Sequence, residues 1–473
     1  MKPMKDRVMA RNIAKNVADH NGRTFYVGGY VRDEVLGKSS KDVDIEVHNI
    51  EPSELKDILS NLGKLRTQGA SFGVYNLEGY DIDIAQPRME KANGRGHKDF
   101  EVYVDPYIGV EKAAERRDFT MNAMMKDVLT GEIVDPFGGM SDCENRIIRH
   151  VNDDTFREDP LRVLRAAQFA SRFDFDIAPE TMHIMSDMDL SALSKERIYG
   201  EMKKALMKSE KPSVFFNAMR DVNQLDTWFP ELKALIGCEQ NPEWHPEGDV
   251  WNHTMAALDA AAGLRNEAEN PEYYMVAVLC HDMGKPSSHS VDEKGNIHTY
   301  KHDVNGVPVV ADFLKRLNND NRLTSYVLDM TANHMKPHEC FDSNSRIKST
   351  NTMYDKSCCP NDLMLLAVAD TASRGLSEET TKEKIYLKER LDKYCERMKE
   401  PEVTGKDLIA LGIKPGPAFS DILKNSHKQH LSGQDKDKVL KGIETVYNKQ
   451  IKKEARLSEL MSHSSADDKS LGE

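Results

Sequence analysis

The feature that most constrains this chain of 473 residues is a glycine pair followed by two aspartates on a short strand. The run at residues 24–29 (TFYVGG) ends in the glycines, and residues 42–47 (DVDIEV) alternate acidic with apolar side chains. A period of two places Asp42 and Asp44 on one face of a strand and the apolar side chains in the core. The glycines allow the backbone to approach a phosphate and offer it N–H groups.

Each of these elements has an ordinary explanation when it stands alone. A glycine pair is usually a turn, and alternating acids are usually the solvated face of a strand. Two carboxylates one strand repeat apart nevertheless suit Mg²⁺, which keeps most of its waters and takes further ligands from substrate phosphates. The order and spacing together favour a metal-assisted phosphoryl or nucleotidyl transfer site.

Two later stretches, residues 116–123 (RRDFTMNA) and residues 158–165 (EDPLRVLR), add arginines and aspartates. The first alone would indicate a salt-bridged helix end, and the second an ordinary helix cap. Asp159 and Arg162 are three residues apart, on one face of a first helical turn. Cytosine and adenine present an amino donor beside a ring-nitrogen acceptor, whereas guanine and uracil present the opposite order. A carboxylate next to a guanidinium therefore accepts C and A, as a template made of protein.

The second half of the chain carries histidines and aspartates separated by helical segments. A single His-Asp pair is a weak signal, since the two side chains often just pair with each other. Imidazole and carboxylate together suit a transition metal better than Mg²⁺. The candidate metal ligands, in chain order, are His253, His281, Asp282, His302, His334 and Asp370.

On these motifs, residues 24 to about 450 resemble the family of class II tRNA nucleotidyltransferases (CCA-adding enzymes) and bacterial poly(A) polymerases, with an HD phosphohydrolase domain. The resemblance implies an α+β fold, in which an N-terminal polymerase-β-like nucleotidyltransferase head, a mixed sheet with helices, precedes all-α neck, HD and tail domains. We predict the head at 1–148, a helical neck with the base-recognition motif at 149–238, the HD domain at 239–376 and a helical tail at 377–473.

The resemblance also implies roles for individual head residues. Asp42 and Asp44 bind the metal, and Asp83, aligned by counting back from Arg88, is the third catalytic acid, with Asp81 as the alternative. Asp118 and Asn122 hold the ribose, while Arg117 is available for the triphosphate or for a supporting salt bridge. The predicted nucleotide-binding residues are Gly28, Gly29, Arg32, Arg117, Asp118, Asn122, Asp159, Arg162 and Arg165.

Three further expectations follow from the resemblance. Residues 195–201 (KERIYGE) match the motif that braces the template helix at Glu196, Arg197 and Glu201, although plain surface charge is the simpler interpretation. The polar segment 91–100 is expected to be a mobile loop. In the HD domain His302 and His334 complete a second metal site beside the minimal set of the other four ligands, and Lys301 stands where relatives often have Gly.

The implied activity is the addition of CMP and AMP to tRNA 3′ ends from CTP and ATP, without a nucleic-acid template. We expect Mg²⁺ in the head and Ni²⁺, Mn²⁺ or Co²⁺ in the HD domain, where 2′,3′-cyclic phosphodiesterase or phosphatase activity is a second expectation. Alternatives are a poly(A) polymerase, a CC-only or A-only enzyme, an HD phosphohydrolase with an RNA-recruiting head, and a noncatalytic tRNA-binding factor. The intact carboxylate and arginine motifs argue against the last two.

Composition limits the partners. The formal net charge of −13 is the wrong sign for coating nucleic acid nonspecifically, so contacts with RNA require local basic patches. Seven cysteines without a C-x-x-C pair indicate a reducing compartment. Lysines and arginines interrupt the first 15 residues, so that we expect neither a signal peptide nor a membrane span. The prediction is a cytoplasmic protein that binds tRNA, CTP and ATP, and neither a membrane nor DNA.

Overall fold

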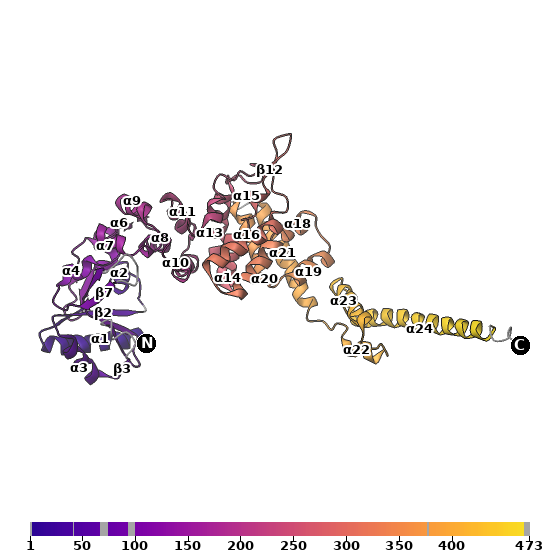
Figure 1. The fold of residues 1–473 in the computed structure, drawn as a ribbon, viewed down its shortest axis with the longest axis horizontal. Helices are drawn as coiled ribbons and strands as arrows, with labels where there is room; N and C mark the ends of the chain where they lie inside the picture. Colours follow the sequence, from indigo (N-terminus) through magenta and orange to yellow (C-terminus); the bar gives the residue numbers. More distant parts are fainter. Residues whose placement is uncertain (1, 41, 67–73, 93–99, 376–377, 468–473) are drawn as a thin grey trace. The chain divides into compact units, whose positions relative to one another are not determined.

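A computed structural model describes residues 2–40, 42–66, 74–92, 100–375 and 378–467, whose order is traced in Figure 1. The chain divides into two compact units. The first unit comprises residues 1–234 and 313–319, and the second comprises residues 235–312 and 320–473. None of the described helices is both long enough and apolar enough to cross a membrane.

A seven-stranded mixed sheet, in the order β3-β4-β5-β2-β1-β8-β9, forms the centre of the first unit. Strand β1 pairs antiparallel with both β2 and β8, whereas β2 and β5 are parallel. Its strands are β1 (Arg23–Val27), β2 (Val43–His48), β3 (Leu65–Arg66), β4 (Val74–Leu77), β5 (Ile82–Ala85), β8 (Met125–Asp127) and β9 (Ile133–Val134). As predicted, Val43, Ile45 and Val47 of β2 are buried, because they form the apolar side of the alternation.

The helices of the first unit include one at the N-terminus and an amphipathic one after β2. They are α1 (Lys2–Asp19), α2 (Gly29–Val35), α3 (Pro52–Leu62), α4 (Val110–Glu115), α5 (Thr120–Ala123), α6 (Gly139–Asn145), α7 (Asp153–Glu158), α8 (Leu161–Phe173), α9 (Pro179–Asp187), α10 (Lys195–Lys208), α11 (Ser213–Asp221) and α12 (Pro230–Lys233). Helices α5 and α6 pack very closely, since a Cβ on Gly139 would lie 2.2 Å from the carbonyl oxygen of Thr120.

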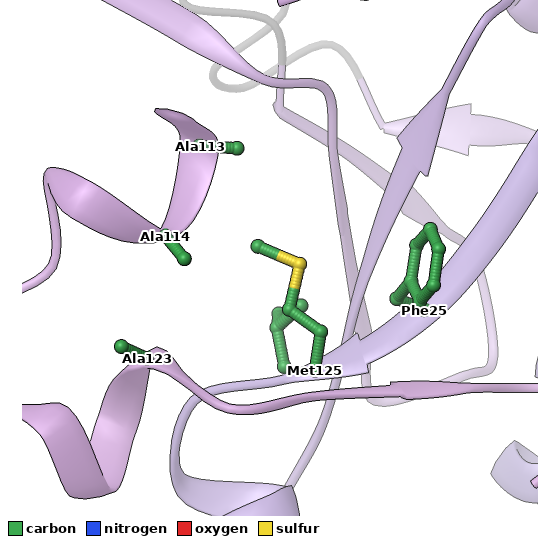
Figure 2. Packing of buried hydrophobic residues seen from close by; sticks show 6 residues of the cluster. Phe25, Ala113, Ala114, Ala123 and Met125 are labelled. Atoms are coloured by element: carbon green, nitrogen blue, oxygen red, sulfur yellow. The ribbon is translucent and has the colours of Figure 1, made fainter. Parts of the chain in front are cut away.

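A small hydrophobic core lies between the sheet and helices α4 and α5, the second of which belongs to the RRDFTMNA stretch. Figure 2 shows Met125 of β8 between Phe25 of β1 and the alanines of α4 and α5. The alanines leave room for the methionine, whose flexible thioether fills the space between helix and strand. This packing fixes α5, and with it the predicted ribose-binding residues, against the strand next to β2.

The segment 91–100, expected to be a loop, begins and ends with residues that belong to strands. Strand β6 (Arg88–Ala92) pairs antiparallel with β7 (Phe100–Val104), so both ends of the segment belong to a ladder. Residues 93–99, on which the expectation chiefly falls, lie outside the described residues.

The second unit is mostly helical. Helix α13 packs along α20, and α14 contacts both of them. Its helices are α13 (Val250–Leu264), the 3₁₀ turn η2 (Arg265–Glu267), α14 (Pro271–Cys280), α15 (Lys285–Ser288), α16 (His302–Leu317), α17 (Asn321–Asn333), α18 (Met335–Asp342), α19 (Ile347–Lys356), α20 (Pro360–Ser373), α21 (Glu378–Arg397), α22 (Gly405–Ala410), α23 (Pro417–Leu431) and α24 (Lys436–Asp467).

The expected α+β fold is confirmed, since the head contains a mixed sheet with helices and the remainder is mostly helical, with short two-stranded ladders in addition. Strands β10 (Ile147–Ile148) and β11 (Asp176–Ile177) form a parallel ladder, and β12 (Ser290–Val291) and β13 (Ile297–His298) form a hairpin. The hairpin turn is stabilised locally, because the Asp292 carboxylate accepts the backbone N–H groups of Lys294 and Asn296, and Gly295 adopts a φ of +82°.

Candidate functional site

The parallel pairing of β2 with β5 brings the predicted head carboxylates together. Asp44 lies directly opposite Asp83 in the register, and Asp42 precedes β2. Burial, and then the like charges of Asp83 and Asp42, raise the pKa of Asp44 to about 6, with Arg117 acting in the opposite sense. A bound divalent cation would relieve this repulsion, so the acids suit a metal.

The alternative third acid, Asp81, lies apart from these carboxylates. Its backbone N–H donates to the Asp6 carboxylate (3.3 Å), and it lines a small cavity with Lys5 and Arg66. Asp83 instead accepts a hydrogen bond from the Asn76 amide (2.5 Å) on the neighbouring strand β4. The geometry therefore favours Asp83 over Asp81.

The glycine pair lies beside Arg117. Gly28 adopts a φ of +63°, which favours glycine, and a Cβ there would lie 3.2 Å from Nη1 of Arg117. Arg117 donates to Glu46 (3.2 Å), which also bonds His48 (2.9 Å). Although burial opposes ionisation of Glu46, the hydrogen bond to His48 and the charge of Arg117 lower its pKa.

Sequence reasoning missed Glu46 and His48 as functional neighbours, because alternation predicts a solvated face for them. Both are buried, since Arg117 covers the polar side of β2 at Glu46. A salt bridge to Glu46 thus holds Arg117 next to Gly28. A supporting salt bridge was one of the two expectations for this arginine.

Four predicted nucleotide-binding residues form one chain of hydrogen bonds across α2, α5 and α8. Arg32 donates to Asn122 (2.8 Å), and the amide of Asn122 donates to Asp118 (3.0 Å). Asp118 also accepts two bonds from Arg165, at 2.8 and 2.5 Å. Burial opposes ionisation of Asp118, yet Arg165 and Asn122 hold the pKa of its carboxyl below the usual value. These side chains are therefore fixed in position before any nucleotide binds.

The predicted base-reading residues lie just before and within the first turn of α8, and each has partners in the fold. The Asp159 carboxylate accepts the N–H of Leu161 (3.0 Å) and pairs with Arg197 of α10 (2.9 Å). Arg162 donates to the backbone carbonyls of Thr155 (2.7 Å) and Arg116 (2.8 Å).

Helix α10 therefore supports the start of α8, as expected, through the ion pair between Arg197 and Asp159. Glu201 of the same helix is 4% exposed and bonds Lys204 (2.8 Å), whereas Glu196 is exposed. Plain surface charge is thus the wrong interpretation for Arg197 and Glu201 and the right one for Glu196.

The second unit gathers all six candidate metal ligands from its helices. His253 of α13 and Asp370 of α20 approach to 3.0 Å, and Asp282, just after α14, lies 3.3 Å from both His253 and His281 through Oδ2. The other oxygen of Asp282, Oδ1, lies 3.3 Å from His302 and 3.6 Å from His334. Asp282 thus joins two groups of ligands.

The two groups are His253, His281 and Asp370, and Asp282, His302 and His334. In each, the ligand atoms lie within 4.8 Å of one another and all three residues are buried. Five of their polar atoms are buried and make ion-pair contacts but no hydrogen bond of good geometry among the described residues: His253 Nε2, His281 Nε2, Asp282 Oδ1 and Oδ2, and Asp370 Oδ1. Buried polar atoms are normally satisfied, so that this cluster fits a divalent metal.

The tautomers of the histidines agree with this interpretation. Each ring binds a carbonyl or carboxylate through Nδ1, which leaves the Nε2 lone pair for the cluster. The partners are Glu247 for His253 (2.6 Å), Val278 O for His281 (2.7 Å), Thr299 O for His302 (2.8 Å) and Thr331 O for His334 (2.7 Å).

Sequence reasoning missed the residues that support these ligands. His338 bonds Asp370 (2.9 Å) and Glu383 (2.7 Å), and although burial opposes its protonation, the two carboxylates raise its pKa to about 10. Lys285 lies 2.7 Å from Asp282. The spacing of His338 four residues after His334 was a usable signal for a shared helix face.

The departure at Lys301 has a structural consequence. Lys301 adopts a φ of +58°, a left-handed conformation that costs a residue with a Cβ about 1–2 kcal/mol. His302 nevertheless reaches its cluster, so the strain is tolerated.

We therefore expect Lys301→Gly to stabilise the second unit by about 0.5–1 kcal/mol, because relief of the strain exceeds the entropy cost of glycine. Lys301→Ala removes the same charge but keeps the Cβ, and is the matched control. Urea midpoints of the three proteins check the expectation, and an equal gain from both substitutions would contradict it.

Three family models match the chain. A model described as "Poly A polymerase head domain" matches residues 24–149, one described as "Probable RNA and SrmB- binding site of polymerase A" matches residues 174–236, and "HD domain" matches residues 250–375.

Curated relatives extend over most of the chain. The Multifunctional CCA protein of Nitrosospira multiformis is 38% identical over 320 residues, which cover 67% of this chain and 74% of the relative. That of Haemophilus ducreyi is 36% identical over 361 residues, covering 74% and 85%.

Among solved structures, a CCA-adding enzyme in apo form I has a TM-score of 0.64 at 20% identity and covers 92% of this chain and 93% of its own. The Bacillus stearothermophilus CCA-adding enzyme in complex with CTP has a TM-score of 0.64 at 21% identity, covering 96% and 100%. At this level of identity the likeness establishes the fold.

Proposed function

We propose, from the premise that this chain belongs to the family of multifunctional CCA proteins, that it is a nucleotidyltransferase that adds CMP and AMP to tRNA 3′ ends. The observation that carries the proposal is the pairing of Asp44 with Asp83 beside Gly28 and Arg117. Transfer from a nucleoside triphosphate requires carboxylates, a glycine turn and a fixed arginine close to one another.

In this proposal the head residues divide the work of one displacement. The RNA 3′-oxygen attacks the α-phosphorus of CTP or ATP and pyrophosphate leaves, while Asp83 accepts the hydroxyl proton. Arg117 faces the triphosphate over Gly28, and Asp118 and Asn122 orient the ribose. Asp42 and Asp44 are the residues that would hold Mg²⁺, which supplies positive charge against the triphosphate when bound.

Incubation of the full chain with tRNA lacking its 3′ end, with each nucleoside triphosphate alone and in combination, tests the proposal. We expect two C additions with CTP, one further A with ATP, and no products with GTP or UTP. Long adenosine tails from ATP alone would instead indicate a poly(A) polymerase, and products ending at CC would indicate a CC-only enzyme.

Base choice is the next expectation. Asp159→Ala and Arg162→Ala should each raise incorporation from GTP and UTP relative to CTP and ATP by roughly tenfold or more, because a lost hydrogen-bond partner is worth about 1–3 kcal/mol. The measurement is single-nucleotide extension of tRNA with each triphosphate offered separately.

Glu196→Ala, at an exposed position of α10, is the matched control and should leave selectivity unchanged. If both test variants keep full discrimination against GTP and UTP, Asp159 is only a helix cap held by Arg197, and the template assignment is wrong.

A second activity is supported by the histidine and aspartate cluster of the second unit. We propose that it hydrolyses 2′,3′-cyclic or terminal phosphates with Ni²⁺, Mn²⁺ or Co²⁺ held by His253, His281, Asp282 and Asp370, and by His302 and His334 in a second position. Its support is the set of buried, closely spaced ligand atoms that make no hydrogen bond among the described residues. Lack of any metal-dependent phosphodiesterase or phosphatase activity would leave the cluster with a structural role.

Two further assignments complete the proposal. We propose the division into a head (1–148), neck (149–238), HD domain (239–376) and tail (377–473) as the functional arrangement. We also propose the cytoplasm as the compartment, and all seven cysteines being free agrees with a reducing environment.

A further inference from the structure

A cavity of about 560 Å³ opens beside the metal-ligand cluster of the second unit. His302, one of the candidate ligands, lines it, as do His338 and Arg374, which both contact Asp370. Its volume is in the range of small-molecule sites. If the phosphate group of a ligand lay at the cluster, the rest of that ligand would therefore occupy this cavity.

Two large aromatic side chains line the same cavity while remaining open to solvent. Trp244 is 60% exposed and Tyr300 is 70% exposed. The ring of Tyr300 stacks on His298, with centroids 4.8 Å apart and planes at 12°, and His298 is in turn bonded to Asp292 of the hairpin turn (3.2 Å). The Tyr300 ring is thus supported from behind and presents a flat face.

We propose that Trp244 and Tyr300 form a nucleobase-stacking subsite of the HD pocket, which selects nucleosidic phosphate esters over base-free ones. Every base has an aromatic face, so stacking binds different bases with similar strength. The inference rests on the proposed phosphohydrolase function of the same pocket and names its substrate class as nucleosidic phosphate esters.

Steady-state kinetics of the full chain with added Ni²⁺ test the subsite. Trp244→Ala and Tyr300→Ala should each raise KM for 2′,3′-cyclic AMP and 2′,3′-cyclic CMP by on the order of tenfold with kcat nearly unchanged. Glycerol 1,2-cyclic phosphate carries the same reacting ring without a base, and its kcat/KM should not change. Trp244→Phe and Tyr300→Phe keep an aromatic face and should restore the KM.

Equal losses for the nucleotides and for the glycerol ester, or no change in either, would overturn the subsite. If the unmodified protein hydrolyses none of these esters, the proposed phosphohydrolase function is wrong. The stacking subsite is then tested separately, by measuring the binding of a nucleotide. Titration with 2′,3′-cyclic AMP should then quench tryptophan fluorescence in the unmodified protein, with the Trp244 contribution missing in Trp244→Phe. Identical quenching in both proteins would show that no base stacks on Trp244.

Discussion

Replacing Asp44 with alanine is expected to reduce nucleotide addition to tRNA by roughly 10³-fold or more, and replacing Asp42 should do the same. Each change removes a carboxylate that would bind Mg²⁺, and loss of that positive charge is worth several kcal/mol in the transition state. Asp42 is exposed and Asp44 is on the polar side of β2, so neither change removes core packing. Extension of tRNA lacking its 3′ end measures the loss.

Asp83 and Asp81 form a matched pair for the same assay. Both are exposed carboxylates two residues apart, but only Asp83 lies opposite Asp44. Asp83→Ala should therefore be as severe as Asp44→Ala, whereas Asp81→Ala should retain activity. Unchanged circular dichroism spectra establish that the variants are folded, and near-normal addition by Asp44→Ala would reject the assigned site.

The second large effect concerns Asp282. Asp282→Asn should lower phosphohydrolase activity by roughly 10³-fold and reduce the bound Ni²⁺, because this carboxylate contacts both groups of ligands. Asparagine is chosen because it preserves the volume beside Lys285, which lies 2.7 Å away. Metal content measured by mass spectrometry and hydrolysis of 2′,3′-cyclic AMP provide independent readouts.

Nucleotide addition is the control activity for Asp282→Asn, because the residues predicted to add nucleotides all belong to the first unit. We expect Asp282→Asn to add CMP and AMP normally, and Asp44→Ala to hydrolyse cyclic phosphate normally. Normal nickel content and hydrolysis in Asp282→Asn would contradict the metal assignment.

Local sequence determined a large part of this protein by itself. Alternation set which side of β2 is buried, because a strand has a period of two. Motif order was enough to single out the head carboxylates and the six histidines and aspartates that the fold brings together. These features depend on a few neighbouring residues, so they can be read from the sequence.

Tertiary structure decided which of these groups meet. Only the register of β2 with β5 separates Asp83 from Asp81, since the two differ by one strand repeat and share the same local pattern. Likewise, Asp159 pairs with Arg197, 38 residues away, because α10 packs against α8. Glu46, His338 and Glu383 take their roles from partners on other elements. Such contacts depend on the packing of distant segments, which no local spacing encodes.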